Sequence, residues 1–189
     1  MTTSEAMLCA EDNSALLVID VQTHLTAVMP AKVLARLQRN IGLLLNAAGL
    51  HNIPVFATEQ YPQGLGTLEE AIIRLLPESA RRYEKTSFSC VNAEGLLDDL
   101  KSTGRKQVII AGMEAHICVM QTAIELLSQD FEVFVVVDAI CSRHRESYET
   151  ALTRLRSAGA TILDAESVLF EWVRDARHDH FKALQAMVR

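Results

Sequence analysis

The sequence predicts a doubly wound α/β domain, in which helices flank both faces of a mostly parallel central sheet. Three observations support this. Short apolar runs recur along the 189 residues, each run is continuously apolar rather than alternating, and segments with helical period separate the runs. A continuously apolar run suits a strand that is covered on both faces. Strands that alternate with helices imply βαβ crossovers, which pair the strands in parallel.

Four runs mark the expected core strands, and a fifth run is weaker. Each of the four is rich in Val, Ile, Leu or Ala, and turn or helix signals follow it. The expected strands cover 15–20, 53–58, 107–112 and 133–138, and the weaker one covers 160–164.

Helical periodicity fills the intervals between these runs. Stripes of apolar residues predict helices over 31–49, from 117 to 127, and over 145–158, where Gly159 stands in the C-terminal capping position. The stretch 59–92 contains two prolines and two glycines, so we expect it to be irregular apart from a short helix at about 67–76.

The whole chain, 1–189, reads as one domain with a core over about 13–174 and a C-terminal helical tail over 175–189. No repeat, low-complexity tract or linker divides it. A chain of this length buries roughly 70% of its unfolded surface, so it needs neither disulfides nor metals to fold.

Charge and composition exclude several kinds of partner. Eighteen basic and twenty-four acidic residues give a net charge of −6, which argues against nucleic acid or an anionic membrane as the main partner. No apolar run approaches the ~20 residues that span a bilayer, and the first residues resemble neither a secretory signal nor a transit peptide. The four cysteines are widely spaced, which indicates reduced thiols. We therefore expect a cytoplasmic protein.

Two residues stand where chemistry is expected. Asp20 closes the first strand, and ligands of open α/β sheets bind at the carboxyl ends of the strands. This carboxylate suits a general base, or alternatively it caps the next turn. Cys118 lies at a predicted helix start, which lowers a thiol pKa and offers backbone N–H groups to an oxyanion. Alternatively, Cys118 is a small core hydrophobe. Lys85 alone would be a solvated lysine.

Four sequence segments, taken in order, contain Asp20, Lys85 and Cys118. They are LLVIDVQ (16–22), EKTSFS (84–89), GMEAHICVMQTAIELL (112–127) and VVVDAICSR (135–143). Together they resemble the isochorismatase-like cysteine hydrolase superfamily, which includes nicotinamidases, N-carbamoylsarcosine amidases and isochorismatases. The similarity covers about 13–174. It is closest to the isochorismatase domain-containing hydrolases, which carry a stretch like TEQYPQGLG (58–66).

The resemblance implies a catalytic triad and an oxyanion hole. The triad maps to Asp20, Lys85 and Cys118. A non-proline cis peptide maps to Met113–Glu114, and it would direct the N–H of Glu114 and the N–H of Cys118 toward one oxyanion. The implied activity is nucleophilic acyl transfer from a small-molecule substrate, in which a Cys thiolate cleaves an amide C–N bond.

The loop 59–66, together with Phe88 and the turn at 20–22, is expected to form the pocket wall. Polar groups that could orient an amide belong to Gln22, Gln60 and Tyr61, and apolar contact would come from Leu25 and Phe88. The alternative is that this stretch is only a turn-rich connector. Leu25 stands where many members have an aromatic residue, which argues against a nicotinamide-like ring as substrate.

We expect no cofactor and no metal in the pocket. Nicotinamidases hold a divalent metal through an Asp-x-His and a further His after the second strand, whereas 52–115 contains no histidine here. His178 and His180 in the tail are expected on a solvated helix face. His24, His116 and His144 are not expected to be catalytic.

Two other functions remain open. An isochorismate-type vinyl-ether hydrolase would use Asp20 as a general acid without a nucleophilic thiol, and the presence of Cys118 favours acyl transfer. A non-catalytic scaffold or ligand-binding protein would keep the fold without needing the triad. A homo-oligomer is expected, because the apolar helices after the third and fourth strands could supply an interface.

Overall fold

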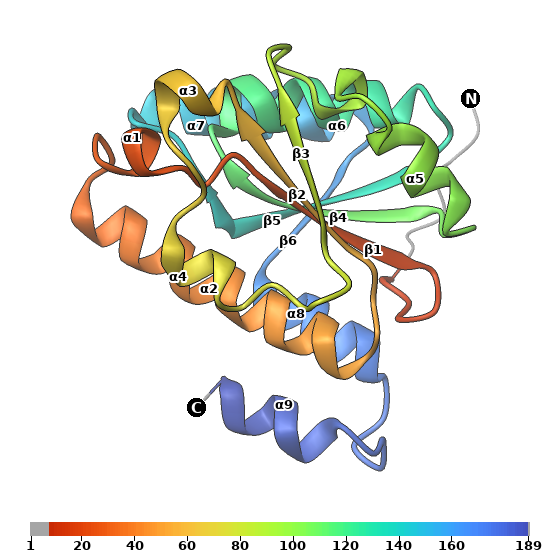
Figure 1. The fold of residues 1–189 in the computed structure, drawn as a ribbon. Coiled ribbons are helices and arrows are strands. Elements are labelled where there is room, and N and C mark those ends of the chain that lie inside the picture. Colours follow the sequence, from red (N-terminus) through yellow and green to blue (C-terminus); the bar gives the residue numbers. More distant parts are fainter. Residues whose placement is uncertain (1–7, 189) are drawn as a thin grey trace.

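The computed structural model describes residues 8–188 and has a six-stranded parallel sheet at its centre (Figure 1). The strand order is β3-β2-β1-β4-β5-β6. The chain therefore adds β2 and β3 on one side of β1 and then adds β4, β5 and β6 on the other side, so the order of strands reverses between β1 and β4. The space beyond the carboxyl ends of these two strands is therefore where an open α/β fold builds its site. The strands are β1 (Ser14–Ile19), β2 (Val55–Gln60), β3 (Arg81–Lys85), β4 (Gln107–Met113), β5 (Glu132–Cys141) and β6 (Thr161–Leu163).

Helices cover both faces of the sheet, which confirms the predicted fold class (Figure 1). One face carries α2 (Ala31–Leu50), α4 (Glu70–Ile73), α8 (Ala165–Val173) and α9 (Phe181–Met187). The other face carries α5 (Leu96–Ser102), α6 (Met120–Leu127) and α7 (Arg145–Ala158). Shorter turns are α1 (Thr23–Thr26), α3 (Pro62–Leu65), the 3₁₀ turn η1 (Cys90–Asn92) and the π-helical turn η2 (Ala115–Val119).

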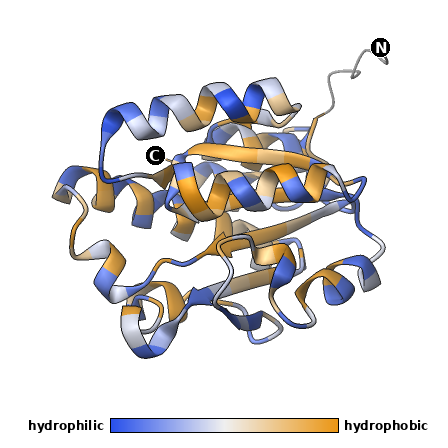
Figure 2. Ribbon diagram, turned by 90° about the horizontal axis from the view of Figure 1, so that it is seen from above, coloured by the Kyte–Doolittle hydropathy of each residue, from blue (hydrophilic) through white to orange (hydrophobic). Residues whose placement is uncertain are grey.

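Alternate side chains of β1 enter two separate cores. Leu16 and Val18 join the cluster under α2 and α8, whereas Leu17 and Ile19 join the cluster under α6 and α7. Figure 2 shows apolar strands between helices that are striped with polar residues. Helices therefore shield both faces of the sheet from water, which explains why the strand sequences are continuously apolar.

Gly112 lets β1 and β4 approach closely at their carboxyl ends. Its φ of +118° lies in the region that favours glycine, and an added Cβ would lie 2.1 Å from the carbonyl oxygen of Ile19. Ile19 is also its partner in the strand register. A larger residue would push apart the two strand ends that carry Asp20 and the segment leading to Cys118.

Some elements differ from the prediction. The stretch 59–92 is not wholly irregular, because it contains α3, the edge strand β3 and η1. The helix expected at about 67–76 is limited to α4. The tail is helical only in α9. His178 and His180 lie in the turn before α9 and are half-buried, so the expectation of a solvated helix face is wrong. Among the helices within 8–188, none is long and apolar enough to cross a membrane.

Candidate active site

The three predicted catalytic residues meet at the carboxyl edge of the sheet. Asp20 directly follows β1, Lys85 ends β3, and Cys118 lies in η2 just after β4. The Nζ of Lys85 lies 2.6 Å from Oδ2 of Asp20, and the Cys118 thiol lies near enough to the Asp20 carboxylate for that charge to raise the pKa of the thiol. All three residues are buried. The arrangement therefore joins a thiol, a carboxylate and an ammonium in one contact chain.

Asp20 is held in a fixed orientation. Its second oxygen, Oδ1, accepts a hydrogen bond of 2.7 Å from the Thr58 hydroxyl, and its backbone N–H donates to the Thr58 carbonyl at 3.1 Å. Its φ of +50° is uncommon for a residue other than glycine. The carboxylate contacts side chains of the site rather than the backbone of the next turn, which favours the base over the cap.

Lys85 is positioned by acceptors on every side. Besides Asp20, its ammonium donates to Oε1 of Gln60 at 2.6 Å and to the carbonyl of Phe88 at 3.1 Å. Burial alone would lower the pKa of Lys85, but the charges that Cys90, Asp20 and Cys118 can carry outweigh it and raise that pKa. Lys85 therefore stays charged, and the acidic side chain in direct contact with it is Asp20.

The Cys118 thiol differs from the sequence-based expectation. A helix start was expected to lower its pKa, but burial, reinforced by the negative charge of Asp20, raises that pKa despite the opposing effect of Lys85. The thiol is thus protonated at neutral pH and lies beside Asp20. This arrangement suits activation by a neighbouring base rather than a preformed thiolate.

The turn before Cys118 contains the cis peptide Met113–Glu114. The Glu114 carboxylate accepts from the backbone N–H of Arg143 at 2.9 Å and from its guanidinium Nε at 3.1 Å. These bonds tie the turn to the segment after β5. The N–H groups of Glu114 and Cys118 both lie at the start of the helical run, where backbone donors lack partners within the helix.

The predicted pocket residues separate into two groups. Gln22 is fully buried: its amide donates to the carbonyls of Gln60 and Gly66 at 3.0 and 2.6 Å and accepts from the Gln60 N–H at 2.7 Å. It therefore positions Gln60 rather than facing a ligand. Leu25 packs against the core on the α2 face. Tyr61 and Phe88, in contrast, are exposed beside the site.

A cavity of about 310 Å³ lies against Lys85. A larger one, of about 480 Å³, contains no triad residue and includes Arg36, Arg143 and Tyr148 in its wall. We take the smaller cavity as the substrate approach because it contacts a member of the triad. The remaining residues in its wall are Tyr61, Pro62, Gln63, Glu84, Thr86 and Asn92.

Sequence reasoning missed two residues that hold the site together. Thr58 closes one of the expected strands, and in the structure its hydroxyl orients Asp20. The signal was its place opposite Ile19 in the parallel register of β1 and β2. Arg143, which holds Glu114, had no such signal, because an arginine after a strand is ordinarily solvated. His116 contacts the Ser142 hydroxyl at 2.9 Å, in keeping with a structural place in this turn.

Comparison with known proteins finds related sequences over most of the chain. Residues 14–167 match the model of the isochorismatase domain. A curated relative, isochorismatase domain-containing protein 2 of Danio rerio, is 41% identical over 150 residues, which are 79% of this chain and 74% of the relative.

Three solved structures share the fold. The MAR1 ribonuclease of Caenorhabditis elegans is 32% identical, with a TM-score of 0.90 over 96% of this chain and 92% of that one. YcaC of Pseudomonas aeruginosa, solved with covalent acrylamide, is 26% identical, with a TM-score of 0.91 over 98% and 92%. YcaC of Escherichia coli, described as an octameric hydrolase of unknown specificity, is 26% identical, with a TM-score of 0.88 over 98% and 91%.

Proposed function

The chain belongs to the isochorismatase family, and from this premise we propose that it is a cysteine hydrolase that cleaves the C–N bond of a small amide. The observation that carries the proposal is the contact chain from the Cys118 thiol through Asp20 to Lys85. A thiol beside a buried base, with an ammonium that balances the base, is the pattern of an activated nucleophile.

The reaction proceeds in two halves. Asp20 takes the proton of Cys118, and the sulfur attacks the acyl carbon while Lys85 balances the local charge. The N–H groups of Glu114 and Cys118 stabilise the oxyanion. Asp20 then gives its proton to the leaving amine, which leaves a thioester on Cys118. In the second half Asp20 takes a proton from water, the resulting hydroxide attacks the thioester, and the thiol returns with the acid product.

Three other functions have to be separated from this one. A vinyl-ether hydrolase would use the same Asp20 and Lys85 without needing the thiol. A binding protein would need none of the three. The name of the Caenorhabditis elegans neighbour raises RNA cleavage, but the net charge of −6 and the buried, acyl-directed triad argue against an RNA substrate. Incubation with a short RNA should leave it intact.

We expect one cysteine to react first with a small electrophile. Cys118 is 6% exposed and touches a base, whereas Cys9 and Cys90 are wholly buried and Cys141 is 1% exposed. Cys90 is wholly enclosed by the protein, so a reagent cannot reach its thiol. Acrylamide, the group found covalently bound in a structural neighbour, is a suitable probe.

Peptide mapping after brief exposure to acrylamide at neutral pH should place the first adduct on Cys118. The Asp20→Asn variant, which lacks the base, should label at a small fraction of the wild-type rate, although its thiol is equally accessible. Equal labelling of Cys118 in both proteins would show that Asp20 does not activate it.

The exposed ring of Tyr61 should determine substrate preference. Tyr61 has a left-handed backbone conformation and lies in the wall of the cavity beside Lys85. Tyr61→Ala removes a contact to the substrate without touching the triad, so KM should rise or the order of substrates should change while kcat on a good substrate is largely kept. Kinetics identical to the wild type on several amides would identify the loop as a connector only.

We also propose that the protein forms a homo-oligomer, since one close structural neighbour is described as octameric. The helices that follow β4 and β5, α6 and α7, remain the candidate interface; α6 is apolar, whereas α7 exposes mainly charged and polar residues.

A further inference from the structure

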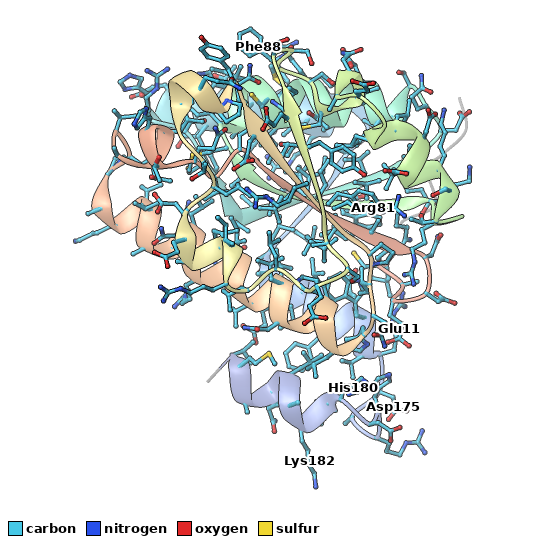
Figure 3. The ribbon with its side chains drawn as sticks, viewed as in Figure 1. Glu11, Arg81, Phe88, Asp175, His180 and Lys182 are labelled. Carbon is cyan, nitrogen blue, oxygen red and sulfur yellow. The ribbon has the colours of Figure 1, made fainter. Side chains whose placement is uncertain are left out.

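Three histidines and one glutamate gather at a place far from the proposed active site. Glu11 precedes β1, His51 follows α2, and His178 and His180 lie in the turn before α9. Figure 3 shows Glu11 and His180 near the base of the molecule, whereas Phe88 beside the candidate active site is at its top. Segments from both ends of the chain and from its middle thus meet here.

Both imidazoles in contact with Glu11 face the same carboxylate oxygen. Nδ1 of His51 hydrogen bonds to Oε2 of Glu11, and Nε2 of His178 lies 3.6 Å from that oxygen. Glu11, His51 and His178 each offer one possible ligand atom, and these three atoms all lie within 4.8 Å of one another. A metal ion with bonds of about 2.0–2.2 Å needs its ligand atoms about 3.3 Å apart, so small side-chain shifts suffice.

A second observation points to a missing partner. The His51 side chain is only 1% exposed, and its Nε2 is a buried polar atom with no hydrogen-bond partner within residues 8–188. The nearby Trp172 indole cannot serve, because its single N–H is already donated to the Ser14 hydroxyl. Buried polar groups in native proteins almost always have a partner.

The spacing of the rings matches a shared ion. In a tetrahedral site, a metal–nitrogen bond of about 2.1 Å places each imidazole centroid about 3.2 Å from the metal, so two centroids lie about 5.2 Å apart. The ring centroid of His51 lies 5.3 Å from that of His178 and 5.0 Å from that of His180. The centroids of His178 and His180 lie 5.5 Å apart. Three such rings and one carboxylate supply the four ligands of an N₃O site.

We propose that Glu11, His51, His178 and His180 bind a divalent transition-metal ion of the zinc type. Glu11, His51 and His178 form the nucleus of the site, with His51 binding through its unpartnered Nε2 and the Glu11 carboxylate giving up its hydrogen bond with Nδ1 of His51 to reach the ion. His180 lies outside this nucleus, and its ring must turn to complete the tetrahedron. The ion would join the segment before β1, the end of α2 and the turn before α9, and so secure the tail to the domain.

Binding has one local cost. Nδ1 of His178 accepts the backbone N–H of His180 at 3.1 Å, which leaves the proton of a neutral ring on Nε2. Coordination through Nε2 moves that proton to Nδ1, so the hydrogen bond from the His180 N–H must break.

The test is zinc binding by the full-length protein. After removal of metal with a chelator and dialysis against buffered Zn²⁺, the wild type should hold one zinc per chain. His178→Ala should weaken the affinity by about 100-fold or more, since a ligand matters at least as much as the partners around it. The matched control is His144→Ala, an exposed histidine outside the cluster, which should bind as the wild type does.

Cys118→Ala must also keep its zinc, because this variant separates the proposed site from adventitious binding at the catalytic thiol. Zinc should raise the Tm of the wild type and of His144→Ala but not of His178→Ala. If His178→Ala folds poorly, Co²⁺ added to the wild type gives an independent readout, because tetrahedral Co²⁺ absorbs strongly in the visible range. Substoichiometric zinc in the wild type, or equal affinity in the His178 and His144 variants, would overturn the proposal.

Discussion

Replacing Cys118 by Ala should lower kcat/KM on a small amide by several orders of magnitude. The substitution removes the nucleophile but leaves the ion pair of Asp20 and Lys85, at 2.6 Å, in place. Without sulfur no thioester forms, and catalysis falls to what the oxyanion donors and substrate binding provide. A vinyl-ether hydrolase would lose little, because Asp20 could still protonate its substrate.

The matched control is Cys9→Ala. Cys9 is also a wholly buried thiol, but it lies before β1, at the edge of the sheet away from the triad. Its variant should lose some stability and keep its turnover, provided that a melting profile shows it folded. Activity that survives in Cys118→Ala as well as it does in Cys9→Ala would remove the thiol from the mechanism.

Replacing Asp20 by Asn should abolish turnover whichever bond is cleaved. The amide oxygen can still accept from Lys85 and the amide NH2 can donate to the Thr58 hydroxyl, so the shape of the site is kept, but the amide can neither take the thiol proton nor protonate a substrate. The change also leaves the buried Lys85 ammonium without its counter-charge. Breaking a buried pair in this way costs about 3–5 kcal/mol of unfolding free energy.

Activity and urea-unfolding midpoints should be measured together for this variant. Asp138→Asn is the control, because Asp138 also lies on a parallel strand and its Oδ1 accepts from the Ala165 N–H at 2.9 Å, a bond that Asn can keep. It should retain both stability and turnover. An Asp20→Asn enzyme with near-normal kcat would exclude this carboxylate as the base.

Much of the fold could be predicted because burial leaves a strong pattern in the sequence. β1, β2, β4 and β5 are covered on both faces, so their side chains are apolar on both sides and they read as continuous runs. The helix over 145–158 could be bounded in advance, since Gly159 takes the left-handed conformation that ends it. The resemblance also placed the cis peptide at Met113–Glu114, where the structure has it.

The rest could not be predicted, for physical reasons. β3 is an exposed edge strand with the sequence RRYEK, and charged residues that protect a sheet edge resemble a loop. The pKa of Cys118 depends on how deeply the thiol is buried and on its distance from Asp20. A position at the start of a helix predicts neither of these. Gln22 lay in the right motif, yet only the three-dimensional contacts show that its amide is already fully bonded.

The most direct test of the central claim is intact-mass spectrometry of the protein mixed with a panel of small amides. Rapid acid quenching should trap a covalent acyl adduct, and peptide mapping should place it on Cys118. The adduct should be absent from Cys118→Ala and present in Cys9→Ala, with the mass of the acyl part alone because the amine has left. Turnover of an amide by the wild type without any adduct on Cys118, at times when the substrate is still being consumed, would contradict the proposed mechanism.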